Sequence, residues 1–354
     1  MRTATFAACG LALTLGCGRP AQAQAYGPRQ FWLAPAGTNV FTVSGMYSSS
    51  NTVVDTSIIF PNLNVDTYVV VPSYARFFGI GDRLSQVSVA VPYAWANVSL
   101  STANRGVTPS KQGLADSYAH LTVGLVNTPA LAPAEFGAYM QQNNPPVVVY
   151  GLMAVLPPTG DYQNDRLVNI GTNRWTFRAG LPTTVRLSPN WAPGKTTTFE
   201  ILPSVDLYTP NNDPAFPEFS IRGRQVGSRL AKVLAPDQTT QAPMGTLEMH
   251  LTHDLNKKLW VSLDSYSRLG GETSSDGTAG GNQQAWTALG ATIGGSPWSK
   301  ARLSFTGAAV PCWRATTTAP MAGNSGFSSS SPSSYVDCVV RFHHLNHKAA
   351  LSRV

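Results

Sequence analysis

Apolar and polar residues alternate along most of this chain, in segments of about ten residues that predict β-strands with one apolar and one polar face. In one clear example, Val87 and Val89 alternate with Gln86 and Ser88. The segment 147–156 is apolar on both faces, which is typical of a barrel wall where the lumen is plugged or narrow. Eleven strands are visible in this way, at 41–47, 68–74, 87–95, 119–125, 147–156, 175–181, 199–207, 247–251, 259–263, 285–293 and 301–309.

The connections between these segments alternate in length. Residues 253–258 and 294–300 form tight turns, whereas the connection 270–281 between them is long and rich in glycine. Short turns at one end and long loops at the other are typical of outer-membrane barrels, and a soluble sandwich has no reason to sort its loops in this way. Residues 210–241 break the pattern, and we favour an extracellular loop with a short helix over a piece folded into the lumen.

These patterns predict an all-β fold, a transmembrane antiparallel up-and-down β-barrel. Single-chain bacterial barrels have an even number of strands, so we expect about 12, with one strand missing from the visible set. Aromatic residues near strand ends fit the interfacial girdles of such barrels, although strands are rich in aromatic residues in any fold. The candidates for these girdles are Tyr93, Trp95, Trp175, Trp286 and Trp298.

The two ends of the chain differ from the barrel pattern. Residues 1–25 have the form of a secretory signal peptide, with Arg2 before a short apolar run and two overlapping cleavage motifs, Ala21-Gln22-Ala23 and Ala23-Gln24-Ala25. No later run of ~18 apolar residues exists that could form a transmembrane helix. We therefore expect a barrel over residues 26–310 and an atypical tail over residues 311–354.

The tail lacks a strand of transmembrane length, although a barrel needs a closing strand. Back-translation of part of the tail with GC-rich codons, in a shifted frame, gives an alternating strand that ends in phenylalanine at a stop codon. We therefore hypothesise that the tail is disordered or that a frameshift replaced the twelfth strand. Its histidines and cysteines then have no selected structure, so we expect no metal site at His343, His344 and His347 and no disulfide between Cys312 and Cys338.

Charged residues make up only 12 % of the chain, against about 25 % in typical soluble proteins. A barrel tolerates this composition because only half of its strand positions face water. The net charge of +7 arises mainly at the two ends, since 19 basic and 17 acidic residues remain when 1–25 and 311–354 are left out. The basic balance therefore does not indicate a nucleic-acid partner.

The connection between the strands at 147–156 and 175–181 carries the most distinctive motif. Residues 157–162 are Pro-Pro-Thr-Gly-Asp-Tyr and residues 169–175 are Asn-Ile-Gly-Thr-Asn-Arg-Trp, in which the prolines and glycines exclude a regular helix. This order resembles the family of outer-membrane transporters named for the MetA pathway of phenol degradation. The residues that carry the resemblance are Pro158, Gly160, Tyr162, Asn169, Gly171, Asn173, Arg174 and Trp175.

Charged residues on the predicted inward faces are the candidates for a selectivity site. Opposed charges inside a pore create a transverse field and constrict the pore, which tunes its selectivity. Strand pairing is expected to place two arginines near two carboxylates, and ion pairs that stiffen a closed lumen are an equal alternative. The set comprises Arg174, Arg178, Glu200, Asp206, Glu248, His250 and Asp264.

An enzymatic alternative would use His250 with Glu248 and a serine, either Ser262 or Ser265, as a base, acid and nucleophile. A barrel phospholipase would carry this set on its outer wall, whereas His250 falls on an inward face. The chain also lacks a Gly-x-Ser-x-Gly motif, a phosphate-binding loop and a dinucleotide fingerprint. We therefore expect no enzymatic activity, no cofactor and no metal.

Together the patterns predict an exported protein of the Gram-negative outer membrane, in contact with lipid and inserted by the barrel-assembly machinery. The family resemblance implies that it passes small aromatic or hydrophobic compounds. A non-conducting structural or adhesive barrel and an outer-membrane barrel hydrolase remain the alternatives.

Overall fold

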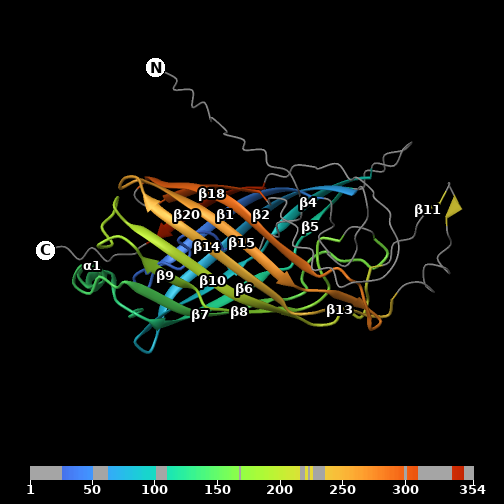
Figure 1. Ribbon diagram of the computed structural model, residues 1–354, viewed down its shortest axis with the longest axis horizontal. Coiled ribbons are helices and arrows are strands. Elements are labelled where there is room, and N and C mark those ends of the chain that lie inside the picture. The colour runs from blue at the N-terminus through green and yellow to red at the C-terminus, as the bar shows by residue number, and fades with distance from the viewer. Residues whose placement is uncertain are drawn as a thin grey trace, which may run out of the picture.

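A computed structural model describes residues 26–50, 63–100, 110–166, 169–215, 220–221, 224–225, 236–298, 301–309 and 337–346. Its main sheet is antiparallel and closes on itself, because β1 pairs with β2 on one side and with β20 on the other. Figure 1 shows the strands tilted around a common axis, as in a barrel.

The strands of the main sheet are β1 (Asn39–Ser50), β2 (Leu63–Ile80), β3 (Arg83–Ala90), β4 (Tyr93–Leu100), β5 (Ser110–Leu114), β6 (Tyr118–Val126), β7 (Val147–Leu156), β8 (Thr176–Gly180), β9 (Thr183–Arg186), β10 (Thr197–Tyr208), β14 (Met244–Asp254), β15 (Leu259–Gly270), β18 (Gln284–Trp298), β19 (Ala301–Ala309) and β20 (Asp337–Asn346). The other elements are α1 (Pro133–Gln142), β11 (Ser220–Ile221), β12 (Arg224–Gln225), β13 (Thr239–Gln241), β16 (Thr273–Ser275) and β17 (Thr278–Ala279).

The main sheet has 15 strands, of which three pairs (β3 with β4, β5 with β6, β8 with β9) continue one another along the chain. The barrel therefore has twelve strand positions within the described residues, as the sequence predicts. Two of the breaks fall at Pro92 and Pro182, which have no N–H to give to the strand ladder. All eleven strands that the alternation predicts are present.

The twelfth position is filled from the tail, which corrects one expectation. Residues 311–354 were expected to contain no strand of transmembrane length, yet β20 pairs with β19 along one edge and with β1 along the other. The expectation failed because this strand lacks the clean alternation of the others. The frameshift hypothesis itself stays a prediction, and residues 310–336 and 347–354 lie outside the described residues.

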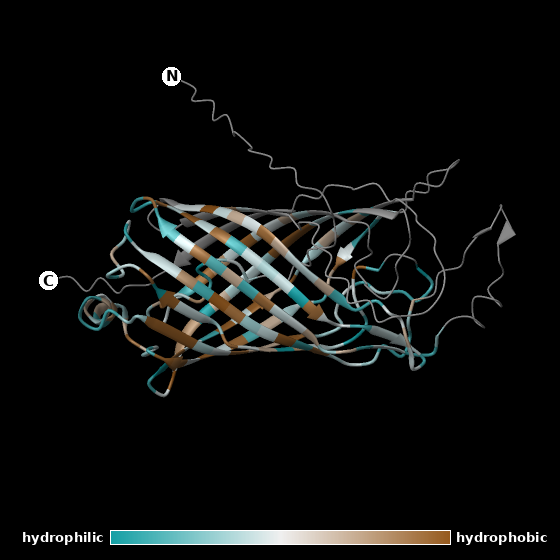
Figure 2. Cartoon of the chain, in the orientation of Figure 1, coloured by the Kyte–Doolittle hydropathy of each residue, from teal (hydrophilic) through white to brown (hydrophobic). Residues whose placement is uncertain are grey.

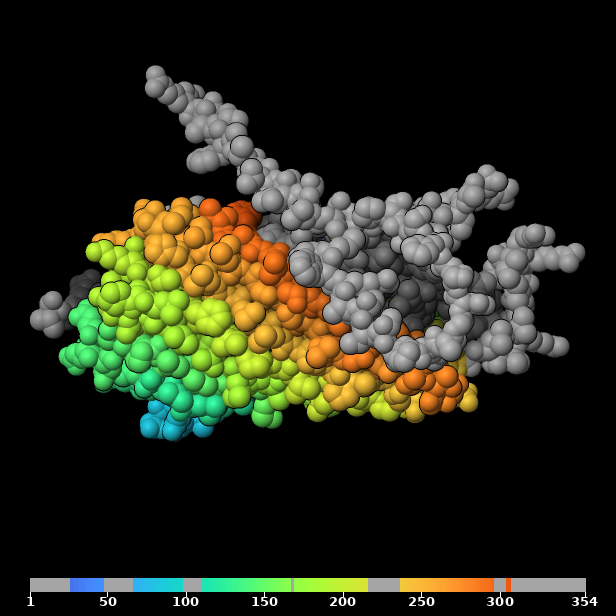
Figure 3. All heavy atoms as spheres, in the orientation of Figure 1, coloured from blue at the N-terminus to red at the C-terminus, as the bar shows by residue number. Residues whose placement is uncertain are grey.

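The two faces of the sheet have the reverse of the usual distribution of polarity. Outward side chains are large and apolar, such as Met153 (70 % exposed), Leu263 (66 %) and Leu269 (63 %), whereas buried inward ones include many threonines, serines and charged residues. Figure 2 shows apolar and polar segments alternating along the strands, and Figure 3 shows side chains packed closely over the coloured part of the face in view. An apolar exterior around a polar interior is the arrangement of a barrel that faces lipid.

The expected aromatic girdle is present only in part. Trp95 and Trp175 are exposed on the outer wall, but Trp286 is buried on the inward face of β18 beside Tyr266. The reason is the phase of the alternation, because Ala285 and Thr287 take the outward positions of that strand. The placement of Trp298 lies outside the side chains that the structure describes.

The connections separate into two ends. At the short-turn end, β2 joins β3 through Gly81 and Asp82, β14 joins β15 through 255–258, and α1 lies between β6 and β7. The opposite end, which we call the loop end, carries the long connections, including residues 157–175 and 271–283. In Figure 1 the label α1 marks the first end, whereas β11 and β13 mark the loop end.

The segment 210–241, for which we favoured a loop with a short helix, contains no helix in its described part. Those residues form the two-stranded pair of β11 with β12, together with β13, which pairs with β16. More widely, no helix in the described chain has the length and apolar character that a membrane-spanning helix requires.

Candidate functional site

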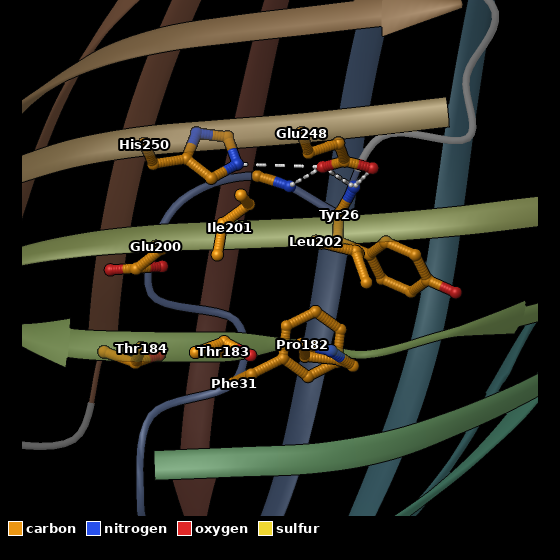
Figure 4. A pocket seen from close by; sticks show the side chains of 11 residues that line it. Tyr26, Phe31, Pro182, Thr183, Thr184, Glu200, Ile201, Leu202, Glu248 and His250 are labelled. Atoms are coloured by element: carbon orange, nitrogen blue, oxygen red, sulfur yellow. Dashed lines mark hydrogen bonds and ion pairs between the residues drawn. The ribbon is translucent and has the colours of Figure 1, made fainter. Parts of the chain in front are cut away.

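The lumen holds the chain's own N-terminal segment. Residues 26–38, which we call the plug segment, precede β1 and join the barrel wall only at their end, where Gly37 and Thr38 bond the backbone of Phe77 on β2. Their backbone and side chains contact carboxylates on β10 and β14, and their aromatic rings pack among inward residues of β2, β3, β6 and β7. Figure 4 shows this segment inside the strands, with Tyr26 and Phe31 directed into the lumen. The sequence-based barrel of 26–310 did not separate it from the wall.

Glu248 on β14 holds the start of the plug segment. The Tyr26 N–H donates to both of its carboxylate oxygens, at 3.2 Å and 3.0 Å, and the Gly27 N–H donates at 3.3 Å. His250 Nε2 lies 3.7 Å from the same carboxylate. Glu248 is only 1 % exposed, so these contacts replace the water that a carboxylate otherwise binds.

Glu200 on β10 holds the middle of the plug segment. It accepts hydrogen bonds from the Arg29 N–H at 2.7 Å, the Trp32 Nε1–H at 2.8 Å and the Thr198 hydroxyl at 3.0 Å. The sequence analysis expected Glu200 near Arg174 and Arg178. Its partners in the structure are instead two donors of the plug segment and Thr198 on its own strand. A side chain that accepts three bonds from fixed donors is suited to hold that segment in one position.

Arg29 anchors the plug segment near the short-turn end. Its Nη1 lies 2.7 Å from Asp254 Oδ1, and its Nε donates to the Thr252 hydroxyl at 3.3 Å. The guanidinium lies over the rings of Trp32 and Trp260, at 4.3 Å and 4.4 Å from their centroids. A guanidinium that is stacked and ion-paired in this way is well fixed.

The other side of the plug segment is apolar. The rings of Tyr26 and Phe31 pack in a tilted arrangement, with their centroids 5.1 Å apart, and lie on an apolar part of the lumen wall. Both ring nitrogens of His120, which faces these rings, are buried without a hydrogen-bond partner among the described residues. We call this part of the wall the apolar lumen wall; it consists of Phe77, Leu84, Val148, Tyr150, Leu152 and Leu202. Val148, Tyr150 and Leu152 belong to the segment 147–156, whose two apolar faces predicted a plugged or narrow lumen.

Arg178 and Asp206 form a buried pair on the adjacent strands β8 and β10. Arg178 Nε donates to Asp206 Oδ1 at 2.6 Å and its Nη2 donates to Oδ2 at 2.8 Å, in a two-pronged geometry. Arg174 lies instead over the Tyr208 ring at 5.0 Å, and its buried Nε has no hydrogen-bond partner among the described residues. The structure thus pairs one of the two arginines with one of the two expected carboxylates.

His250, Asp264 and Ser262 lie together on the lumen wall, in an order that does not suit a hydrolase. Asp264 Oδ1 bonds His250 Nδ1 at 2.8 Å and accepts the Ser262 hydroxyl at 2.5 Å, while Thr292 donates to Oδ2 at 2.5 Å. The carboxylate therefore lies between the histidine and the serine, whereas a nucleophile must bond the base. The arrangement is a polar network across β14, β15 and β18.

The family-motif loop, residues 157–175, has a defined fold at the loop end, and close packing requires its glycines. A Cβ on Gly160 would lie 2.6 Å from Gly171 Cα, and one on Gly171 would lie 2.7 Å from the Gly160 carbonyl carbon. Asp116 holds the two halves together, because its oxygens accept the Gly160 N–H at 2.9 Å and the Thr172 N–H at 2.9 Å. The sequence analysis did not single out Asp116.

The remaining motif residues also serve the loop itself. The Asn169 side chain accepts the Gln163 N–H at 2.8 Å and donates to the Gln163 carbonyl at 2.9 Å. Asn173 has a positive φ of 52° and donates to Asn211 at 2.8 Å, and the Tyr162 hydroxyl donates to the Asp213 carbonyl at 2.8 Å. Trp175, in contrast, lies outside on Phe177. Pro158 is half-buried at the start of the loop.

The lumen residues that the sequence did not single out include those of the plug segment. They also include Arg268, a buried residue of β15 whose Nε donates to the Tyr266 hydroxyl at 3.0 Å. The aromatic cluster at Phe31 and Trp32, directly after the predicted signal peptide, was the available signal for the plug. Within the described residues, no group of three or more His, Cys, Asp and Glu side chains could hold a metal ion. The side chains of His343 and His344, and all of His347, lie outside that description.

Comparison with known proteins agrees with this architecture. A family model described as "Putative MetA-pathway of phenol degradation" matches residues 44–297, which confirms the resemblance seen in the motif loop. The crystal structure of the COG4313 outer membrane channel from Pseudomonas putida F1 is similar over 90 % of this chain and 99 % of that chain, with 13 % identity and a TM-score of 0.63. That likeness shows the fold.

More distant barrels also match. The toluene transporter TbuX from Ralstonia pickettii has 7 % identity and a TM-score of 0.41, over 89 % of this chain and 90 % of its own. The transport unit of the autotransporter AIDA-I from Escherichia coli has 10 % identity and a TM-score of 0.38, over 90 % and 95 %. These scores are too low to support an argument about this chain. No curated protein matches the sequence.

Proposed function

Since the chain belongs to the MetA-pathway family of phenol degradation, we propose that it is an outer-membrane channel for small aromatic or hydrophobic compounds. The observation that carries this proposal is the apolar lumen wall beneath Tyr26 and Phe31. A general porin lines its water-filled lumen with polar groups, whereas this lumen has an aromatic and aliphatic surface among its inward side chains. Moving the plug segment aside exposes that surface to a solute.

In this mechanism Phe31 occupies the position that an aromatic solute takes during passage. Burying a phenylalanine side chain contributes about 1.5–3 kcal/mol, which a small aromatic ring recovers when it replaces Phe31 on the same wall. The bonds to Glu200 and Asp254 then keep the plug segment attached while its apolar residues move. The channel in this way conducts apolar solutes without standing open to ions.

The test compares Phe31→Ala with Phe177→Ala, a matched variant whose ring is exposed on the outer wall. Proteoliposomes are given nicotinamide, a polar aromatic that crosses bare lipid slowly, or arabinose, a sugar of similar size. We expect nicotinamide to enter faster than arabinose, Phe31→Ala to raise nicotinamide entry several-fold, and Phe177→Ala to match the unmodified protein. Equal rates for both solutes indicate a general pore, and no entry in any variant indicates the non-conducting alternative.

The charged residues of the lumen keep the selectivity role that the sequence suggested for them as a proposal. Arg174, with its buried Nε lacking a hydrogen-bond partner among the described residues, is the strongest candidate to meet a polar group on the solute. The expected partners are therefore lipid at the outer wall, the solute in the lumen and the assembly machinery during insertion. The hydrolase alternative has no support in the order of His250, Asp264 and Ser262.

A further inference from the structure

The contact between Tyr26 and Glu248 has a geometry that suits a chain terminus better than a peptide bond. The Tyr26 nitrogen lies 3.0 Å from one carboxylate oxygen of Glu248 and 3.2 Å from the other. A peptide nitrogen has one hydrogen, which the two oxygens must share, whereas an ammonium group has three and can give each oxygen its own. Figure 4 shows the Tyr26 nitrogen directed at the middle of the carboxylate.

The electrostatics of Glu248 favour a full positive charge at this position. The carboxylate is almost completely buried, and among the described residues its one partner of opposite charge within ion-pair distance is His250, at 3.7 Å. His250 is already engaged at 2.8 Å by Asp264 on its other ring nitrogen. A buried carboxylate is costly unless a positive group compensates it, and an α-ammonium group on Tyr26 supplies that charge.

The sequence offers two export cleavage sites, and only one of them creates this group. Cleavage after Ala23 leaves Tyr26 with an ordinary peptide nitrogen, whereas cleavage after Ala25 makes Tyr26 the first residue of the mature chain. We propose that the export signal peptidase cleaves the Ala25–Tyr26 bond and that the new α-ammonium group docks on Glu248 inside the lumen. Water supplies the balance of the reaction, because its hydroxyl completes the carboxylate of Ala25 and its proton completes the Tyr26 amine.

Glu248 is therefore the binding site for the mature N-terminus, and the plug segment takes its position in the lumen only after the signal peptide is removed. The order of events follows from this: export first, removal of the signal peptide second, and insertion of the terminus into the lumen third. The inference concerns the processing and docking of the chain. It holds whether or not the barrel passes aromatic solutes, so the two proposals fail independently.

The first test is the intact mass of the full chain purified from outer membranes after expression with its own signal. We expect a mass that begins at Tyr26. A mass that begins at Gln24 overturns the proposal, because the Tyr26 nitrogen is then part of a peptide bond.

The second test measures how accessible the α-amine is in the folded protein. An amine-reactive acyl ester near neutral pH modifies an α-amine, with a pKa of about 7.7–8.0, ahead of lysines, and the N-terminal peptide is then quantified by mass spectrometry. We expect labelling of the unmodified protein to be roughly tenfold or more slower than that of Glu248→Gln, since bonds to charged groups are the strong ones. Glu135→Gln, on the exposed helix α1, is the matched control and should label as slowly as the unmodified protein.

A second variant keeps the test independent of any folding defect in Glu248→Gln. One glycine inserted between Ala25 and Tyr26 moves the new α-amine about 3.8 Å along the chain and leaves every lumen residue in place. We expect this extended chain to label as fast as Glu248→Gln. Slow labelling of both variants, or fast labelling of the unmodified protein, overturns the docking of the terminus on Glu248.

Discussion

The ion pair between Arg178 and Asp206 shows how much a single residue in the lumen can contribute to the stability of the fold. The side chains of both are at most 1 % exposed, and they meet through two parallel hydrogen bonds. Such a pair contributes little compared with two apolar residues of similar volume, but removing one partner leaves the other charge buried without compensation. The pair therefore matters most when it is broken.

We predict that Asp206→Leu lowers the free energy of unfolding by about 3–5 kcal/mol, because it removes the carboxylate that pairs with the buried Arg178 guanidinium. The double variant Arg178→Met with Asp206→Leu should recover most of this loss. Urea unfolding in detergent micelles, followed by tryptophan fluorescence, measures both. If the double variant is as unstable as the single one, the charge is not the cause of the loss.

The motif glycines also act as single residues, because the absence of a Cβ lets the backbones of Gly160 and Gly171 pack together. We predict that Gly171→Ala destabilises the motif loop by about 1–3 kcal/mol, because the new Cβ meets the backbone of Gly160 at 2.7 Å. Gly45→Ala is the matched control, because a Cβ there has nothing within 4 Å. Limited proteolysis of residues 157–175 should accelerate in the first variant alone, and equal rates would show that the close approach is not required.

At the scale of elements, the strand β20 decides whether the sheet closes. It pairs through most of its length with both β1 and β19, so its loss leaves two unpaired edges in a barrel that otherwise has none. Unsatisfied backbone groups are costly in lipid, and a barrel with open edges is not a viable membrane structure. The tail therefore carries an element that the rest of the fold requires.

We predict that a chain truncated after residue 309 fails to assemble in the outer membrane, whereas one truncated after residue 346 assembles normally. The first lacks β20 and the second retains it. Protease resistance of the membrane-inserted protein measures assembly. Normal assembly of the shorter chain would show that the barrel can close without β20.

The sequence could predict elements that have a local pattern, and it could not predict those that depend on distant contacts. Strands with strict alternation were found because their outer face meets lipid and their inner face meets the lumen, as at Val87 and Val89. The plug segment was missed because its partners Glu200 and Glu248 are 171 and 222 residues away in the chain, and no local pattern encodes such contacts. Helix α1, which begins at Pro133, was missed because it has no buried face.

At the scale of the whole molecule, the outer surface of the barrel is mainly apolar and its interior is mainly polar. The outer wall carries the large apolar side chains, and the lumen buries carboxylates, arginines and threonines. The exception is the apolar lumen wall, and the plug segment covers it. The molecule is thus a lipid-facing cylinder whose inner apolar surface is covered by the plug segment and, by our proposal, binds the solute.

An apolar outer wall in lipid predicts that the energetic cost of placing a charge on it depends on how deep in the membrane the charge lies. Leu263 and Leu269 are both exposed on β15, at 66 % and 63 %, but Leu263 lies inside the strand whereas Leu269 is one residue from its loop end. In a bilayer, Leu263→Arg should cost about 2–4 kcal/mol and Leu269→Arg about 0–1 kcal/mol, because the charge at the deeper position is further from water. Unfolding in urea from lipid vesicles measures both, with Leu263→Met as the control for the loss of leucine. A soluble protein would tolerate arginine equally at two such exposed positions, so equal and small costs would contradict a membrane-spanning wall, whereas a difference of this size requires lipid around the middle of β15.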